Sequence, residues 1–123
     1  MAYEIPGFVL GTILAGDSLT TAQYRFVDIT DGDSVGLAAA GSAKVIGTLN
    51  NAPAEGEVCE IVTSGVAKVK CDDTVAEGGI LQVGASGGAV ALASGYGVGV
   101  ALEDGIVNQV ISVRLGEYGA TEG

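Results

Sequence analysis

The sequence repeats itself once, and this internal repeat constrains the fold more than any other feature. Residues 20–38 can be laid over residues 74–93, and the match continues with small slips toward the end of both copies. The matched positions include Thr20 with Thr74, Ala22 with Ala76, Gly32 with Gly87, Val35 with Val90, Leu37 with Leu92, Gly41 with Gly95, Leu49 with Leu102 and Val58 with Val110. Two copies of about fifty residues account for nearly the whole chain, and a fixed period of this kind determines the architecture of a fold. We expect two β-rich halves that close one core.

Short apolar runs alternate with clusters of glycine, aspartate, asparagine and serine, which predicts an all-β fold. The 21 glycines among 123 residues also oppose long helices, and the length is that of a single domain. We expect strands at 8–14, 25–29, 35–38, 45–49, 58–63, 66–70, 80–83, 90–92, 98–102 and 109–115. We expect turns at 31–32, 50–51, 64–65, 86–88 and 104–105, and single helical turns at 20–24 and 73–77.

The two cysteines, Cys59 and Cys71, allow two interpretations. A hairpin over 58–70 with its turn at Gly65 places them at equal distances from the turn, where they could form a disulfide. Alternatively, both are buried thiols that pack as small hydrophobic side chains. The repeat aligns Cys59 with Ile111, an apolar position on the core face of its strand, which favours burial. Their spacing, without a CxxC motif, gives little indication of a zinc site.

Three aspartates, Asp28, Asp31 and Asp33, lie close together in the sequence DITDGD and raise the question of a calcium site. An EF-hand loop needs carboxylates at alternate positions and a glutamate at its twelfth position, and the spacing here differs. The second copy has glycines in this region, so the scaffold does not need the carboxylates. We therefore predict a solvated hairpin turn. The glycine-rich stretches 84–88 and 94–100 lack a GxGxxG match and a lysine, and we predict turns there too.

The net charge of −10 limits the partners of this chain. Such a surface repels nucleic-acid backbones and anionic membranes, so we expect neither as a partner. The stretch 78–102 carries no charge, but it is rich in glycine and its first-copy equivalent is charged. We interpret both stretches as parts of a soluble sheet.

The absence of histidine removes the commonest general base and the commonest metal ligand. The paired carboxylates at 72–73 and 103–104 lie in predicted turns, and no lysine stands in a motif that would activate a serine. We expect no enzymatic activity, no cofactor and no metal.

The two ends of the chain differ from the repeats. Residues 1–10 have no clear partner in the second copy and contain two of the few aromatic residues. Such an apolar arm can lie on its own domain or add a strand to the sheet edge of a neighbour. We expect an N-terminal arm over 1–10, a β-barrel domain over 11–116 with halves at 11–63 and 65–115, and a flexible tail over 117–123.

The order of motifs in the chain resembles a known family. An AAGSAKVIG stretch precedes the strand VCEIVTSGVAKV, and LASGYGVGVALEDG precedes a closing VISVRL strand. This order resembles the small capsid decoration, or cement, proteins of tailed bacteriophages. The resemblance implies a compact β-barrel or β-tulip-like domain that binds the outer surface of the mature capsid, often as a trimer. It also implies a clamp on neighbouring capsid subunits, commonly through an N-terminal arm, and it brings no catalytic residues.

The leading hypothesis is a structural virion protein on the capsid exterior, assembled in the host cytoplasm. Its partners would be the major capsid protein and two further copies of itself. Tyr3, Ile5, Phe8 and Val9 are the predicted attachment residues, in an arm that is mobile until it binds. One alternative is another virion component, such as a fibre-base or tail adaptor domain, although long fibre-like repeats are absent. A carbohydrate- or ligand-binding β domain is a second alternative, which would need aromatic side chains around a groove.

Overall fold

The computed structural model describes residues 5–10, 13–31 and 34–116, and these residues form an all-β fold. The strands are β1 (Ile5–Leu10), β2 (Leu14–Ala15), β3 (Phe26–Asp31), β4 (Ser34–Leu37), β5 (Val45–Leu49), β6 (Ile61–Lys70), β7 (Ile80–Val83), β8 (Ala89–Ala91), β9 (Gly99–Ala101) and β10 (Val110–Leu115). The described residues contain no helix, and the predicted helical turns at 20–24 and 73–77 are turns and bends. The predicted fold class, a compact barrel-like all-β domain, is confirmed.

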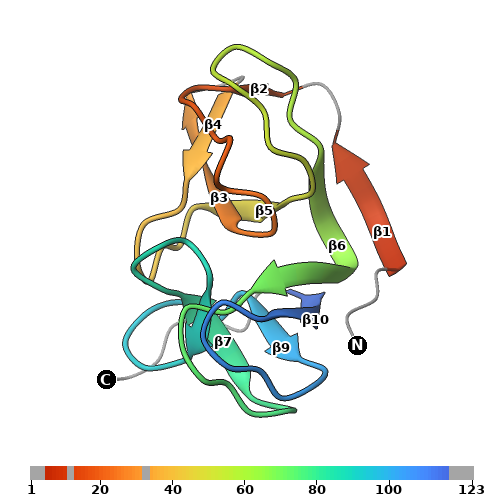
Figure 1. The fold of residues 1–123 in the computed structure, drawn as a ribbon, viewed down its shortest axis with the longest axis vertical. Coiled ribbons are helices and arrows are strands. Elements are labelled where there is room, and N and C mark those ends of the chain that lie inside the picture. Colours follow the sequence, from red (N-terminus) through yellow and green to blue (C-terminus); the bar gives the residue numbers. More distant parts are fainter. Residues whose placement is uncertain (1–4, 11–12, 32–33, 117–123) are drawn as a thin grey trace.

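The order of the strands shows the duplication. The sheet runs β2-β4-β3-β5-β6-β10-β9-β7-β8, so that β4-β3-β5-β6 is mirrored by β8-β7-β9-β10 across the β6–β10 contact. The strand pairs are antiparallel except for β2 with β4. Figure 1 shows the two groups of strands as an upper and a lower part of the molecule, joined by the long strand β6.

Strand β6 passes through the position where we expected a hairpin. The expected turn at 64–65 is wrong, because Ile61–Lys70 is one continuous strand. Gly65 lies inside it with φ of 84°, a backbone conformation that glycine adopts without strain. At this residue β6 changes its partners: β5 and most of β1 pair with its first part, and β10 pairs with its last part. The Ser-Gly sequence therefore marks a bend between the two halves, which we call the first half (β1 to the bend) and the second half (from the bend to β10).

Strand β1 belongs to the sheet of its own chain. Residues 5–10, which we expected to extend as an arm, pair antiparallel with β6. Val9 lies opposite Val62 of β6, just as Val66 of β6 lies opposite Arg114 of β10. Strand β1 therefore has the same place in the first half as the last part of β6 has in the second half. The repeat extends to the N-terminal strand, although the sequence comparison found no partner for it.

Hydrogen bonds in the loops repeat from one half to the other. The Tyr24 amide donates to the Leu49 carbonyl at 2.7 Å, and the Gly78 amide donates to the Ala101 carbonyl at 2.7 Å. Positive φ angles recur at the same places, at Tyr24 and Gly78 and again at Gly56 and Asn108. Three further backbone bonds of the first half, each from an amide to a carbonyl, have a counterpart in the second half. The bond from Asn50 to Glu60 corresponds to the bond from Leu102 to Ser112. Likewise, Ala38 to Phe26 corresponds to Leu92 to Ile80, and Glu57 to Ala54 corresponds to Gln109 to Ile106. The two halves thus share loop conformations as well as strand order.

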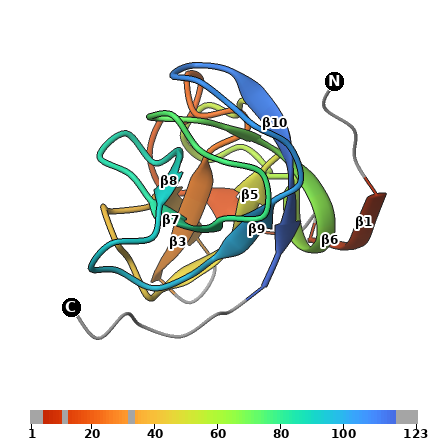
Figure 2. The same cartoon turned by 90° about the horizontal axis from the view of Figure 1, so that it is seen from below.

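The interior contains two hydrophobic clusters instead of the single core that we expected. One gathers second-half residues such as Leu81, Ile111 and Val113, and the other gathers first-half residues such as Leu49 and Ile61. Strand β3 lies between them, because Phe26 packs in the second-half cluster and Val27 in the first-half cluster. Successive side chains of a strand point to opposite faces, so one strand serves both clusters. The first half therefore supplies part of the second half's core. Figure 2 looks from the second half toward the first.

Candidate functional site

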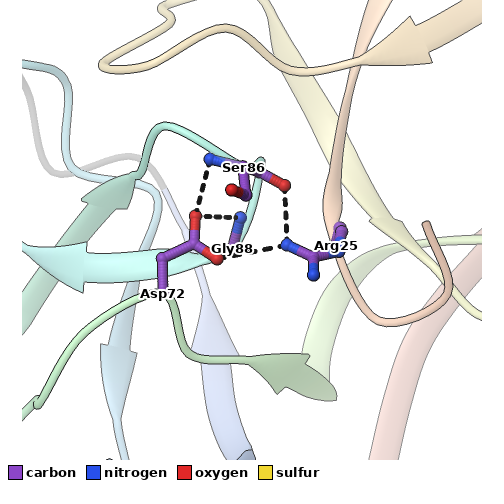
Figure 3. A network of polar contacts seen from close by, with 4 residues as sticks. All are labelled: Arg25, Asp72, Ser86 and Gly88. Atoms are coloured by element: carbon purple, nitrogen blue, oxygen red, sulfur yellow. Dashed lines mark hydrogen bonds and ion pairs between the residues drawn. The ribbon is translucent and has the colours of Figure 1, made fainter. Parts of the chain in front are cut away.

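A network of polar contacts connects the two halves (Figure 3). Arg25 donates through one nitrogen to Asp72 Oδ1 at 3.1 Å and to the Ser86 carbonyl at 2.7 Å. The other carboxylate oxygen of Asp72 accepts the backbone amides of Ser86 and Gly88, both at 2.9 Å. The two charged side chains are only 14% and 12% exposed, so this ion pair holds the start of β3 against the β7–β8 loop.

The glycine-rich loop over 84–88 wraps around the Asp72 carboxylate. A Cβ added at Gly84 would lie 2.7 Å from Asp72 Oδ2, and one at Gly88 would collide with Asp72 Oδ1. Converging backbone amides of this kind make an anion-binding concavity. Here the anion is a side chain of the protein itself, so the loop is structural. The turn predicted over 84–88 is present, but no sequence pattern indicated that Asp72 lies at its centre.

Asp28 and Gln82 occupy equivalent positions and each organises the loop that follows. Asp28 accepts from the Ala39 amide at 3.2 Å and from the Ser42 hydroxyl at 2.9 Å. The Gln82 oxygen accepts the amides of residues 93, 94 and 95, at 2.8, 3.1 and 2.8 Å. Asp28 is buried, so the prediction of a solvated carboxylate is wrong for it. The side chains of Asp31 and Asp33 lie outside the described part, and no metal-binding cluster occurs among the described residues.

Both cysteines are free and fully buried, which decides between the two interpretations. They pack in different clusters, Cys59 in the first-half cluster and Cys71 in the second-half cluster. Burial raises the pKa of Cys59, and burial with the nearby charges of Asp72 and Glu103 raises the pKa of Cys71 to about 11. A thiol with such a pKa stays protonated at neutral pH and is a poor nucleophile.

The predicted attachment residues lie on β1. Ile5, Phe8 and Val9 pair in register with Val66, Ser64 and Val62 of β6, and Tyr3 lies outside the described residues. Strand β1 pairs with no described strand other than β6.

The described surface also exposes several large apolar side chains. Ile106 and Val107 are the most exposed, at 64% and 52%, in the loop between β9 and β10. The equivalent first-half positions are Ala54 and Glu55, so the shared loop does not require apolar residues there. A hollow of about 480 Å³ adjoins this loop and is lined by Thr74, Val75, Ala76, Ala91, Asp104, Gly105, Ile106 and Gln109. Another of about 360 Å³ lies between the halves, lined by Phe26, Val45, Ile46, Gly47, Thr63, Val98, Leu115 and Gly116.

Only Asp104 is charged among the residues that line these two hollows. The lining of the hollow beside the β9–β10 loop includes the Thr74 hydroxyl and the Asp104 carboxylate, and this carboxylate accepts the Glu77 amide at 2.8 Å. One further carboxylate, Glu103, accepts the Ser112 amide at 2.9 Å, and this hydrogen bond lowers its pKa. Among the described residues no helix is long and apolar enough to span a membrane.

Comparison with known proteins gives a likeness in fold. No family model matches the chain, and no curated protein matches it in sequence. Among solved structures, the chain is similar to the N base of the head fiber protein gp8.5 of bacteriophage phi29, with a TM-score of 0.69 and 18% identity. The likeness covers 94% of this chain and 100% of that one. At this identity the match shows a shared fold over nearly the whole length of both chains.

Proposed function

We propose that this protein is a non-enzymatic structural component of a bacteriophage virion, bound to the exterior of the capsid. The observation that carries the proposal is the shared fold with the N base of a phage head fiber, over nearly the whole of both chains. The polar interior supports a structural role, since Arg25, Asp72 and Gln82 are engaged in holding backbone segments. On the capsid the protein acts as a cement protein that clamps adjacent major capsid protein subunits, with three copies at each binding position.

The attachment element in this proposal is β1. Because β1 pairs with no described strand besides β6, a strand of the major capsid protein can add to its second edge by backbone hydrogen bonds. Tyr3, Ile5, Phe8 and Val9 would then supply the side chains that recognise the capsid. This mode does not require β1 to leave its own sheet, which differs from the mobile arm expected from the sequence.

Co-sedimentation with the phage's own capsids tests the proposal. The full chain should pellet with capsids, and binding to expanded shells but not to unexpanded ones would identify a protein that acts on the mature shell. Deletion of residues 2–10 should abolish binding, whereas deletion of residues 117–123 serves as the matched control. Because the first deletion uncovers an edge of β6, a Tyr3→Ser/Phe8→Ser variant that keeps the strand accompanies it. Failure of the full chain to bind either form of capsid would exclude the proposal, and full binding by both β1 variants would exclude attachment through β1.

A head-fibre base is the second candidate, because the matched structure is itself a fiber base. Cryo-electron microscopy of decorated particles separates the two. A cement protein leaves density that ends close to the shell, whereas a fibre base continues into a projecting stalk. An elongated, stable trimer in free solution would likewise favour the fibre base.

A further inference from the structure

The hollow of about 480 Å³ beside the β9–β10 loop is built by three segments of the second half. Residues 74–76 lie between β6 and β7, Ala91 ends β8, and the remaining lining residues belong to the β9–β10 loop. The amide of Val75 donates to the Gly105 carbonyl at 2.9 Å, and the amide of Gly105 donates to the Val75 carbonyl at 3.1 Å. Both residues are buried. The hollow is therefore formed by segments that backbone hydrogen bonds already hold together.

Exposed apolar side chains line this hollow. Ala76, Ala91 and Ile106 are exposed members of the lining, and Ile106 is 64% exposed. The next residue in the loop, Val107, is 52% exposed. Apolar side chains that gather at the surface with polar residues around them are typical of sites that bind another molecule.

The hollow lies where the second half is shorter than the first. Two matched pairs of backbone bonds show this: Leu19 to Pro53 with Val75 to Gly105, and Arg25 to Ala22 with Gly79 to Ala76. In the first half, residues 20 and 21 separate Leu19 from Ala22, whereas in the second half Val75 directly precedes Ala76. Ala22 is only 4% exposed, but its equivalent Ala76 is exposed and lines the hollow.

The border of the hollow is acidic. Asp104 lines the hollow, and its carboxylate accepts the Glu77 amide at 2.8 Å. The carboxylate of Asp73 accepts the amide of Thr74, another lining residue, at 2.7 Å. These two hydrogen bonds place both carboxylates beside the segment 74–77, and both aspartates are exposed. All five positive side chains of the protein lie in the described part of the chain, and the lining includes none of them.

We propose that this hollow docks a segment of another protein in which an apolar side chain stands next to lysine or arginine. The apolar side chain packs against Ala76 and Ile106, and the neighbouring cations pair with Asp73 and Asp104. A second copy of this chain is disfavoured as the occupant, because its net charge of −10 is repelled by an acidic border. The lining contains no residue of β1, so docking here is additional to the attachment in the proposed function.

NMR titration of the full chain, labelled with nitrogen-15, tests the site without a capsid. The probe is a synthetic pentapeptide amide with a central leucine and two lysines on each side. It should shift the amide signals of the lining residues, and its binding should weaken as salt is raised, since salt screens the charges. A peptide with serine in place of leucine should bind about tenfold more weakly, because it buries no apolar side chain. A peptide with glutamates in place of the lysines should not bind.

Variants of the protein test the two parts of the site separately. Ile106→Ser removes the apolar contact and should weaken binding of the leucine–lysine peptide by about tenfold. Asp104→Asn keeps an oxygen for the Glu77 amide but removes the charge, so it should weaken binding several-fold and reduce the salt dependence. Val58→Ser and Glu55→Gln make matched changes at exposed residues of the first half and should leave binding unchanged. Thermal unfolding of each variant checks that the fold is retained.

Three results would overturn the inference. They are a leucine–lysine peptide that leaves the lining signals unshifted, a glutamate peptide that shifts them equally, and an Ile106→Ser variant that binds as tightly as the wild type. The proposed function fails separately, through the capsid co-sedimentation described above. A chain that pellets with capsids but does not bind the peptide lacks this site and retains the proposed function, whereas the opposite pair of results supports the site alone.

Discussion

The two halves of this protein share one backbone and differ in what they present to solvent. In the first half, Phe26 projects from the sheet into the core of the second half, and its paired neighbours Thr48 and Val62 are buried with it. In the second half, the equivalent residues of Phe26 and Val62 are Ile80 and Arg114, and both are exposed. Each half therefore acts as an internal control for the other. Features common to both halves maintain the scaffold that they share.

Truncating the two equivalent residues is the strongest test of this comparison. Phe26→Ala should reduce the free energy of unfolding by about 3–5 kcal/mol, since it leaves a cavity in the core. Ile80→Ala removes a side chain that is 39% exposed and should cost less than about 1 kcal/mol. Chemical denaturation monitored by circular dichroism measures both values. Similar losses for the two variants would mean that these equivalent residues contribute equally to stability, contrary to their difference in burial.

The junction between the halves gives the next largest effect. Asp72→Ala leaves Arg25 and the amides of Ser86 and Gly88 without their acceptor, which should cost about 2–4 kcal/mol. Asp73→Ala removes the same negative charge from the neighbouring, exposed residue, and it should reduce the free energy of unfolding by less than about 0.5 kcal/mol. The same denaturation measurement applies. Equal stability of the two variants would show that the polar network does not hold the halves together.

The internal repeat made much of the scaffold predictable. Strands 45–49 and 80–83 were predicted with their observed bounds, and the burial of Cys59 followed from its alignment with Ile111. These features depend on local pattern, which is readable along the chain.

Long-range contacts were not predictable from local pattern. The bend at Gly65 has the sequence of a hairpin turn, and only the change of strand partners distinguishes the two. The pair of Arg25 with Asp72 spans 47 positions and has no equivalent in the other copy, so neither spacing nor repetition revealed it. The small number of positive side chains was a usable signal for this ion pair. The chain has only five, so an acidic partner can be considered for each of them.

The buried thiols predict a change of stability at alkaline pH. Because the pKa of Cys71 is about 11 in the folded protein, above its ordinary value near 9.0, the unfolded chain releases this proton first as pH rises. Stability should therefore fall as pH increases from about 9 to about 11. Denaturant midpoints for the wild type and for Cys71→Ala, compared across this range, measure the effect. The variant should lose less stability between these pH values, and an identical pH dependence would contradict the assignment to this thiol.

The smallest expected effect lies in the loop that the halves share. Gly56 and Asn108 are equivalent residues with positive φ, 84° and 68°, and a Cβ at Gly56 would meet nothing within 4 Å. Asparagine tolerates this conformation better than other residues that carry a side chain. Gly56→Asn should therefore change the unfolding free energy by only a few tenths of a kcal/mol, whereas Gly56→Val should cost about 1–2 kcal/mol because of backbone strain. Thermal unfolding of both variants measures the difference. A large loss for Gly56→Asn would mean that the two loops, although alike in hydrogen bonding, impose different demands on the same position.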